Sequence, residues 1–390
     1  MRIALVAGEA SGDTLGAALI EALRRRFPGA QFAGVAGPRM IAAGCNSWFH
    51  SEELGVMGLT EVLRHLPRLL RIRSQLQRRI LDWRPDVFVG VDFKEFNLGL
   101  ARRLKKQGLR TVQYVSPQVW AWRQGRARTI GESVDLILCL FPFEPEFYRE
   151  HGVRATFVGH PLADQIPLEV DRAAARAELG LEPAARVLAL LPGSRRGEVE
   201  RLAEAFAGAA ALLTTRFPGL RMVAPMVTPA LRDLFARHCA RIAPQADIRF
   251  LDGNSRQALA AADVALVASG TATLEAALCK RPMVVAYRLG AITAFLLRNL
   301  GLVKVKHFSQ PNLLAGKELV PEFFQGAANP RNLADAVARW LEHPEEAAQL
   351  QREFTRIHET LKRGGADRAA AEIGDLLSAW TAQVSAHEAP

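Results

Sequence analysis

The chain has 390 residues with 49% apolar content, which is too much for one ordinary hydrophobic core and predicts two domains. Lysine and arginine exceed aspartate and glutamate by 50 − 40 = 10, which favours an anionic partner such as nucleic acid, a phospholipid surface or a phosphorylated metabolite. The four cysteines lie far apart without metal-ligand spacing, which argues against a disulfide framework or a zinc site.

The N-terminal segment is the densest chemical signal. A strand at 3–6 leads into a loop at 8–13, and a helix is expected from Thr14. Gly8 allows a tight turn and close approach to a ligand. Glu9 and Asp13 distinguish the loop from one that cradles phosphate, so we predict hydroxyl binding or acid–base chemistry here, with an ordinary turn as the alternative. The N-terminus has no signal-peptide pattern and no segment is apolar enough to span a membrane, so we expect a cytoplasmic protein.

Apolar runs alternate with helical patterns along the whole chain, as in parallel sheets buried on both faces. In the first half the predicted strands are 3–6, 31–35, 87–91, 111–115 and 136–140. After Pro161 they are 187–191, 222–225, 248–251, 264–267 and 283–286. Right-handed crossovers would make each half a doubly wound α/β sheet, with ligands outside the carboxyl ends of the strands.

A helix expected from Pro67 has two sets of apolar residues. One set has helical spacing and explains a core stripe: Leu69, Ile72, Leu76, Ile80 and Trp83. The other set is left over among arginines: Val62, Leu63, Leu66 and Leu70. We predict that this second set dips into an anionic membrane surface, with extra core packing as the alternative.

Asp92 follows strand 87–91, at the end where open α/β sheets place reactive groups. We predict that it is the general base that takes a proton from an attacking hydroxyl. Glu9, Asp13, Glu95 and His160 are the rival bases, and a helix cap is the structural alternative for Asp92.

Two tryptophans beside a cation, Trp120, Trp122 and Arg123, could line a sugar or acyl pocket, although aromatics after a strand also suit a core. His160 stands near the predicted domain boundary, as a substrate-binding residue or a hinge residue.

The second half contains a predicted anion site. Ser269, Gly270 and Thr271 open a helix after strand 264–267, where free N–H groups and the helix dipole suit a diphosphate. Glu275, one turn later, could reach a ribose hydroxyl. Arg195 follows strand 187–191 and could clamp phosphate oxygens, or it could simply be a surface arginine. No Gly-x-Gly-x-x-Gly or Walker loop supports a dinucleotide site.

Together, these motifs resemble the bacterial lipid-A-disaccharide synthases, in the order of that family and over most of the chain. The segments that carry the resemblance are 8–13, 35–40, 114–123, 159–160, 191–195, 268–275 and 311–316. One segment departs from the family pattern Asp-x-Pro-Asp-Phe-Asn, because Lys94 and Glu95 replace its proline and second aspartate.

The resemblance implies a glycosyltransferase-B fold, in which two Rossmann-like domains face a cleft. Residues 1–160 would bind the acceptor and face the membrane, 161–345 would bind the UDP-sugar donor, and helices in 346–390 would pack back on the first domain. The implied site residues are catalytic Asp92, Glu9 and Asp13; donor-binding Arg195, Ser269, Gly270, Thr271, Glu275 and Asn312, with Gln310, Tyr287 and Arg288 as weaker candidates; and substrate-binding Ser11, Trp120, Trp122, Arg123 and His160.

The implied reaction is an inverting transfer that joins UDP-2,3-diacylglucosamine to 2,3-diacylglucosamine 1-phosphate and gives a β-1,6-linked disaccharide 1-phosphate and UDP. We expect no metal and no cofactor beyond the UDP-linked co-substrate, no nucleic-acid partner, and peripheral association with the cytoplasmic side of the inner membrane. A homodimer stays open. The alternatives are a UDP-sugar 2-epimerase of the same fold and a non-catalytic protein that binds anionic lipid.

Overall fold

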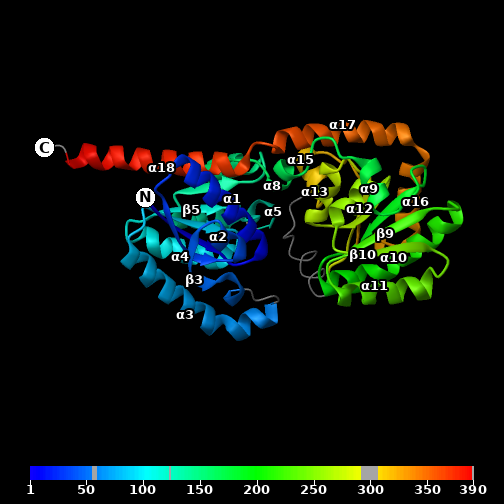
Figure 1. Ribbon diagram of the computed structural model, residues 1–390, viewed down its shortest axis with the longest axis horizontal. Coiled ribbons are helices and arrows are strands. Elements are labelled where there is room, and N and C mark those ends of the chain that lie inside the picture. Colours follow the sequence, from blue (N-terminus) through cyan, green and yellow to red (C-terminus); the bar gives the residue numbers. More distant parts are fainter. Residues whose placement is uncertain (55–58, 123, 291–305, 389–390) are drawn as a thin grey trace. The chain divides into compact units, whose positions relative to one another are not determined.

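The computed structural model describes residues 1–54, 59–122, 124–290 and 306–388; within these, the side chains of 59–66, 121–122, 124 and 381–388 are outside the description. The chain forms two compact units, one from Met1–Asp164 with Leu361–Pro390 and the other from Gln165–Thr360 (Figure 1). The boundaries therefore fall after residues 164 and 360, where the sequence suggested 160 and 345. The second boundary lies later because α17 (Pro344–Leu361) joins the second unit, where Glu353 pairs with Lys317 at 3.5 Å.

The first unit contains a seven-stranded parallel sheet in the order β3-β2-β1-β4-β5-β6-β7. Its strands are β1 (Arg2–Ala7), β2 (Gln31–Ala36), β3 (Cys45–His50), β4 (Val87–Val91), β5 (Arg110–Tyr114), β6 (Leu136–Cys139) and β7 (Ala155–Phe157). The helices of this part are α1 (Ala10–Arg26), α2 (Pro38–Ala42), α3 (Leu59–Trp83), α4 (Lys94–Lys105), α5 (Val119–Trp122), α6 (Ala127–Ser133), α7 (Glu144–Arg149), α8 (Pro161–Gln165) and α18 (Gly365–Glu388).

Helices cover both faces of this sheet because alternate side chains of each strand point to opposite sides. Ile3 and Leu5 of β1 pack with α1 and α18 in one cluster, whereas Ala4 and Val6 pack with α3 and α4 in another. The strand order reverses between β1 and β4. This reversal is a topological switch point, where doubly wound sheets open a crevice at the carboxyl ends of their strands.

The second unit contains a six-stranded parallel sheet in the order β10-β9-β8-β11-β12-β13. Its strands are β8 (Val187–Leu191), β9 (Arg221–Met226), β10 (Asp247–Asp252), β11 (Val264–Ala268), β12 (Met283–Tyr287) and β13 (Glu322–Phe324). Besides α17, its helices are α9 (Arg172–Glu178), α10 (Arg196–Arg216), α11 (Pro229–Ile242), α12 (Ser255–Ala261), α13 (Thr271–Leu278), α15 (Gln310–Ala315) and α16 (Pro330–Glu342). Leu188 and Leu190 pack under α10, α11 and α16, and here the order reverses between β8 and β11.

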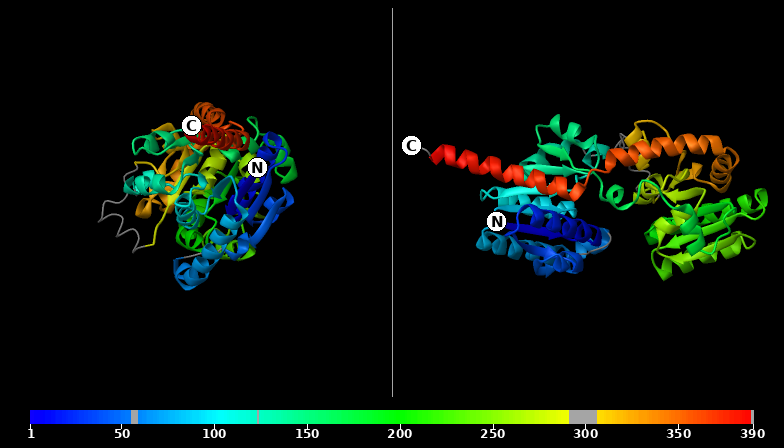
Figure 2. Two further views of the ribbon diagram at one scale, coloured as in Figure 1. Left: turned by 90° about the vertical axis from the view of Figure 1, so that its left-hand side faces the viewer. Right: turned by 45° about the horizontal axis from the view of Figure 1, so that its top comes forward.

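The C-terminal helix α18 belongs to the first unit and lies beside α1 (Figures 1 and 2). Ile373 is fully buried in the cluster that contains Leu19. Arg25 pairs with Asp367 at 2.6 Å, and the Arg110 guanidinium lies 3.4 Å from the ring centroid of Trp380. An apolar stripe with a few flanking ion pairs therefore fixes the end of the chain on the first domain.

The predicted two-domain parallel α/β fold is confirmed, and the structure adds strands β3, β7 and β13, which are too short or too polar to stand out in the sequence. Two helix starts were wrong. The first helix begins at Ala10 and includes the loop residues up to Asp13, and α3 begins at Leu59, with Pro67 inside it. The core stripe on α3 is confirmed, since Ile72, Leu76 and Ile80 are buried.

Within the described ranges, no helix is long and apolar enough to cross a membrane. The same residues contain no group of three or more His, Cys, Asp or Glu side chains that could hold a metal ion. All four cysteines are buried free thiols, as the sequence suggested.

Candidate active site

The switch point of the first sheet brings together the loop after β1 and the residue after β4. Ala7 and Val91 are register partners, so the two chains leave the sheet side by side. As a result the Ser11 hydroxyl lies 3.4 Å from Asp92 Oδ2 and can donate to it. Asp92 is half-buried, whereas Glu9 and Ser11 are exposed. This edge therefore presents a carboxylate, a hydroxyl and a second acid toward solvent.

The backbone at Asp92 is strained and firmly held. Asp92 and Phe93 have φ values of 50° and 38°, in the left-handed region that non-glycine residues rarely adopt. Two fully buried amides fix this turn, because Asn97 Nδ2 and Gln113 Nε2 donate to the Asp92 carbonyl at 2.9 and 3.0 Å. A glycine is needed at position 8, where a Cβ would lie 2.6 Å from the Phe93 ring. Strain held in this way is typical of functional sites.

A third strained residue follows β5 at the same edge. Val115 has φ 77°, which is an outlier for a β-branched residue. The chain continues from Val115 to Trp120. The Trp120 indole N–H donates to Glu144 Oε1 at 3.2 Å, and its ring meets Phe143 edge-on at 4.8 Å between centroids. Trp120 is thus a positioned, half-buried side chain at the carboxyl edge of the sheet.

Glu144 is 2% exposed and holds this corner together. Its Oε2 accepts the N–H groups of Leu140 and Phe141 at 3.1 and 3.0 Å. Burial raises the pKa of Glu144 to about 7, although hydrogen bonds from these donors, Ser116 and Trp120 oppose the shift. The sequence analysis missed Glu144. The criterion that selected Asp92, an acid directly after a predicted strand, does not find Glu144, because residues 141–143 separate it from strand 136–140.

His160 is a buried residue at the end of the first unit's main segment. Its Nδ1 accepts the Leu162 N–H at 3.2 Å, and its ring lies 5.5 Å from that of Phe141. Burial lowers the pKa of His160 to about 4, so the ring is neutral at physiological pH. Its backbone N–H donates to the Leu361 carbonyl at 2.9 Å, which ties the two chain segments of this unit together.

Two of the predicted acids already have partners in the structure, one of them in a buried helix cap and the other in an exposed ion pair. Asp13 is 4% exposed and accepts the N–H groups of Gly37, Arg39 and Met40 at 2.9–3.0 Å, so its carboxylate caps α2. We therefore reassign Asp13 from the catalytic to the structural residues. Glu95 forms a two-pronged ion pair with Arg126 at 2.9 and 3.0 Å, which weakens it as a rival base.

The second sheet's switch point brings together the loops after β8 and β11, whose ends Leu191 and Val267 are register partners. Arg195 precedes α10, and its side chain is 81% exposed. Glu198 Oε2 already accepts the N–H groups of Ser194 and Arg195, at 3.1 and 3.3 Å. The Arg195 guanidinium, 3.7 Å from Glu198 Oε1, is therefore the group of this loop best placed to meet an anion.

The N-terminus of α13 is open at the same edge. Gly270 has φ 144°, which favours glycine, and both Gly270 and Thr271 are exposed. The first turn of a helix leaves N–H groups free for an anion. Ser269 donates to the Phe308 carbonyl at 3.1 Å, and Glu275 accepts from Ser255 Oγ at 3.0 Å. Both side chains are thus oriented by neighbouring loops.

Two donor-site candidates are internal braces. Asn312 is fully buried; its amide donates to the Val320 carbonyl and accepts the N–H groups of Leu319 and Val320, at 2.7–3.0 Å. Its side chain closes the loop after α15, so we reassign Asn312 from ligand contact to loop support. Arg288 likewise donates to three backbone carbonyls, those of Arg201, Gln325 and Ala328.

Gln310 and Tyr287, the weaker donor-site candidates, have neighbours in the second unit, whereas several other candidates lie outside the described residues. Gln310 donates its N–H to Thr273 Oγ1 at 3.2 Å, and the half-buried Tyr287 lies 5.8 Å from Phe308 between ring centroids. Arg123 and the side chain of Trp122 lie outside the described residues. The side chains of Val62, Leu63 and Leu66 also lie outside the description, whereas the fourth predicted membrane residue, Leu70, is 44% exposed.

Known proteins resemble this chain over nearly its whole length. The lipid-A-disaccharide synthetase family matches residues 3–373. A lipid-A-disaccharide synthase of Xanthomonas campestris pv. campestris (strain 8004) is 52% identical over 378 residues, which cover 97% of this chain and 86% of the relative. One from Alkalilimnicola ehrlichii is 56% identical over 375 residues, which cover 96% and 98%.

Solved structures show a similar fold at low identity. UDP-GlcNAc 2-epimerase from Neisseria meningitidis, bound to UDP-GlcNAc, aligns with a TM-score of 0.62 and 13% identity over 97% of this chain and 99% of its own. The calicheamicin glycosyltransferase CalG4 aligns with a TM-score of 0.57 and 19% identity over 97% and 98%. At such identities the likeness concerns the fold alone.

Proposed function

Because the chain is a glycosyltransferase of the lipid-A-disaccharide synthetase family, we propose that it joins UDP-2,3-diacylglucosamine to 2,3-diacylglucosamine 1-phosphate. The products are the β-1,6-linked disaccharide 1-phosphate and UDP. A nucleotide-sugar donor and a sugar-phosphate acceptor agree with the excess of basic residues, 50 against 40 acidic ones.

Asp92 is the general base of this reaction. Its carboxylate takes the proton of the acceptor's 6-hydroxyl while that oxygen forms the new bond to the anomeric carbon of the donor. The bond from this carbon to the diphosphate breaks, and UDP leaves from the opposite face with inversion. The Ser11 hydroxyl, 3.4 Å from Asp92 Oδ2, orients the carboxylate, and Glu9 is the remaining exposed acid of the same edge.

The second unit binds the donor and stabilises the departing diphosphate. The open N-terminus of α13, at Gly270 and Thr271, offers N–H groups and the positive end of a helix dipole. The exposed Arg195 guanidinium adds a full positive charge beside the developing negative charge. Glu275, oriented by Ser255, is the candidate partner of a ribose hydroxyl.

The observation that carries the proposal is the strained turn at Asp92, held by two buried amides at a switch point. Asp92→Asn should lower kcat by about 10²- to 10⁴-fold, the usual contribution of a positioned base, and leave UDP affinity near that of the wild type. Glu95→Gln is the matched control, because Glu95 is a nearby carboxylate in the first turn of α4 and pairs with Arg126. Full turnover of Asp92→Asn, together with its loss in Glu9→Gln, would move the base to Glu9.

The reaction class has its own test. Incubation with both diacylated monosaccharides should give a disaccharide phosphate on a thin-layer plate, and UDP-N-acetylglucosamine alone should give no free sugar. Free sugar without an acceptor would instead indicate the UDP-sugar 2-epimerase reaction, which is the alternative that the shared fold raises.

We also propose that the enzyme works at the cytoplasmic surface of the inner membrane, with α3 as its contact. Leu70 is exposed on this helix between Arg68 and Arg71, which are exposed as well. Exposed apolar groups among arginines suit a surface that dips into anionic lipid, where the acyl chains of both substrates reside.

A further inference from the structure

A cavity of about 310 Å³ lies in the second unit, at the amino ends of its central strands. Arg186 and Asp263 line it, and each directly precedes a strand, β8 and β11 respectively. The donor-site loops leave the same strands at their carboxyl ends, about 16 Å away for a five-residue strand. The cavity is therefore distinct from the proposed donor site.

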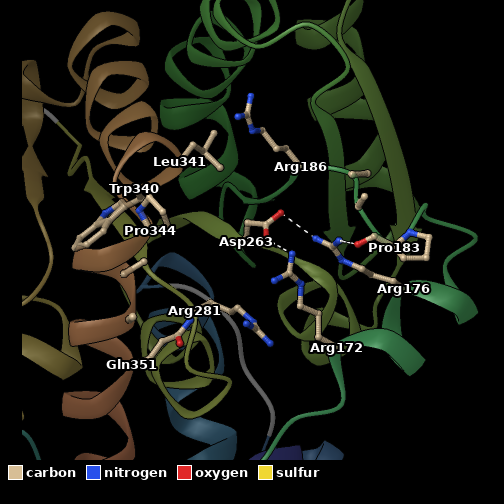
Figure 3. Close-up of a pocket in the computed structure, with 14 residues that line it drawn as sticks. Arg172, Arg176, Pro183, Arg186, Asp263, Arg281, Trp340, Leu341, Pro344 and Gln351 are labelled. Atoms are coloured by element: carbon tan, nitrogen blue, oxygen red, sulfur yellow. Dashed lines mark hydrogen bonds and ion pairs between the residues drawn. The ribbon is translucent and has the colours of Figure 1, made fainter.

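The cavity walls carry a large excess of positive charge. Four arginines line it, Arg172, Arg176, Arg186 and Arg281, against one carboxylate, that of Asp263. Asp263 is already engaged by Arg172 and Arg176, and its Oδ2 also accepts the Val187 N–H at 2.8 Å (Figure 3). The lining thus contains no second carboxylate for Arg186 or Arg281.

Support of the fold accounts for only part of this charge. Arg176 Nε donates to the Ala261 carbonyl at 2.9 Å, and Arg281 donates to those of Leu259 and Ala260 at 3.0 and 3.1 Å. These carbonyls end α12, and a helix C-terminus is equivalent to about half a negative charge, far less than the excess of 4 − 1 = 3. Burial, and then the charge of Arg172, lower the pKa of Arg281, although the nearby Asp263 carboxylate opposes the shift.

The opposite wall is largely apolar. Trp340 and Leu341 come from the end of α16, and Pro344 and Ala347 come from the start of α17 (Figure 3). The Trp340 indole N–H is buried and has no acceptor among the described residues. A ligand that fits must therefore combine a compact anion with a small flat or apolar body, and a cavity of this size admits only a small molecule.

We propose that this cavity is a binding site for a small organic phosphate. The phosphate group lies between Arg172 and Arg281, whose guanidinium groups suit its oxygens. Arg186 points away from them, with its guanidinium 5.4 Å from the ring centroid of Phe217, and adds positive charge at the edge of the cavity (Figure 3). The organic part lies against Trp340 and Leu341.

Phenyl phosphate is a suitable probe, with inorganic phosphate and phenol as its two halves. Calorimetric titration of the full chain should show binding of phenyl phosphate, weaker binding of inorganic phosphate and no binding of phenol. Because phosphate could also enter the donor site, hydrogen–deuterium exchange should locate the ligand. Protection is expected in 172–186 and 340–351.

Two variants test the site by different means. Arg172→Gln removes a charge and leaves Asp263 paired with Arg176, and it should weaken binding about tenfold or more. Ala347→Phe keeps every charge but fills the cavity, and it should abolish binding. This second variant tests the site independently if Arg172→Gln is poorly folded. Arg237→Gln, on the exposed face of α11, is the matched control and should bind as the wild type does.

The proposal would be overturned by equal affinity in the wild type and Ala347→Phe. It would also be overturned by protection confined to the donor-site loops at 193–195 and 269–271. Neither result depends on whether the chain transfers sugars.

Discussion

Glu144 offers a direct test of how burial affects stability in this protein, because its nearly fully buried carboxylate accepts hydrogen bonds from Leu140, Phe141 and Trp120, with Ser116 as a fourth donor. One oxygen accepts the N–H groups of Leu140 and Phe141, and the other accepts the Trp120 indole N–H. Replacement by Gln keeps the shape of the side chain and removes its titration. The amide can still serve the two backbone donors, but its NH₂ group then faces the indole N–H, so the link to Trp120 is lost.

The size and sign of the effect follow from the pKa of Glu144, which burial raises from 4.5 to about 7. Between pH 4.5 and about 7 the Glu144 carboxyl keeps its proton in the native state but has released it in the unfolded state. The contribution of this raised pKa to the free energy of unfolding is therefore full below pH 4.5 and is lost as the pH rises through about 7. At 1.36 kcal/mol for each unit of pKa, the free energy of unfolding of the wild type should fall by about 3 kcal/mol relative to Glu144→Gln across this range.

Tryptophan fluorescence during urea unfolding can follow this change in the first unit. Five of the six tryptophans lie there, and only Trp340 lies in the second unit, so a Trp340→Phe background restricts the signal to the unit that contains Glu144. The two units need not unfold together, and this restriction keeps a two-state analysis valid.

Glu132→Gln is the matched control, because Glu132 is half-exposed and pairs with Arg102 at the surface. Its stability should run parallel to that of the wild type at every pH. If Glu144→Gln also runs parallel to the wild type from pH 4.5 to 8, then Glu144 is not buried in the way that the structure describes. Glu144→Gln also breaks the link to Trp120. If this variant shows a higher KM for the acceptor with little change in kcat, that result would support a place for Trp120 at the acceptor site.

Three other perturbations test the remaining assignments. Arg195→Ala should weaken UDP binding about tenfold or more in calorimetry, because a charge-assisted contact is lost, whereas Arg196→Ala should not; equal effects would remove Arg195 from the donor site. Leu70→Ser should reduce flotation with anionic vesicles, and the equally exposed Leu212→Ser on α10 should leave it unchanged; unchanged flotation in both would count against α3 as the membrane contact. Asp13→Asn should cost about 3 kcal/mol in urea unfolding, because one buried carboxylate serves three N–H donors; a loss of turnover at full stability would return Asp13 to the catalytic residues.

The sequence alone was enough for the architecture of this protein. Continuous apolar runs as short as 87–91 and 187–191 suit strands buried on both faces, and their alternation with longer helical patterns indicates parallel sheets. The right-handed crossover then places the residues after each run at one edge, which is why Asp92, Arg195 and Thr271 could be proposed before any coordinates. The motifs likewise carried the resemblance to the family.

Only the tertiary structure decided which of the candidate side chains are open to a ligand. Asp13 and Asn312 have the residue types of a site, yet their hydrogen bonds go to backbone groups distant in the chain, and no local pattern records such pairings. Conversely, the raised pKa of Glu144 depends on its burial and its hydrogen-bond donors, and both exist only in the folded chain. The cavity beside Asp263 also arises from packing, because Arg172 and Arg176 of α9 meet Arg186 and Arg281, which come from two other segments of the chain.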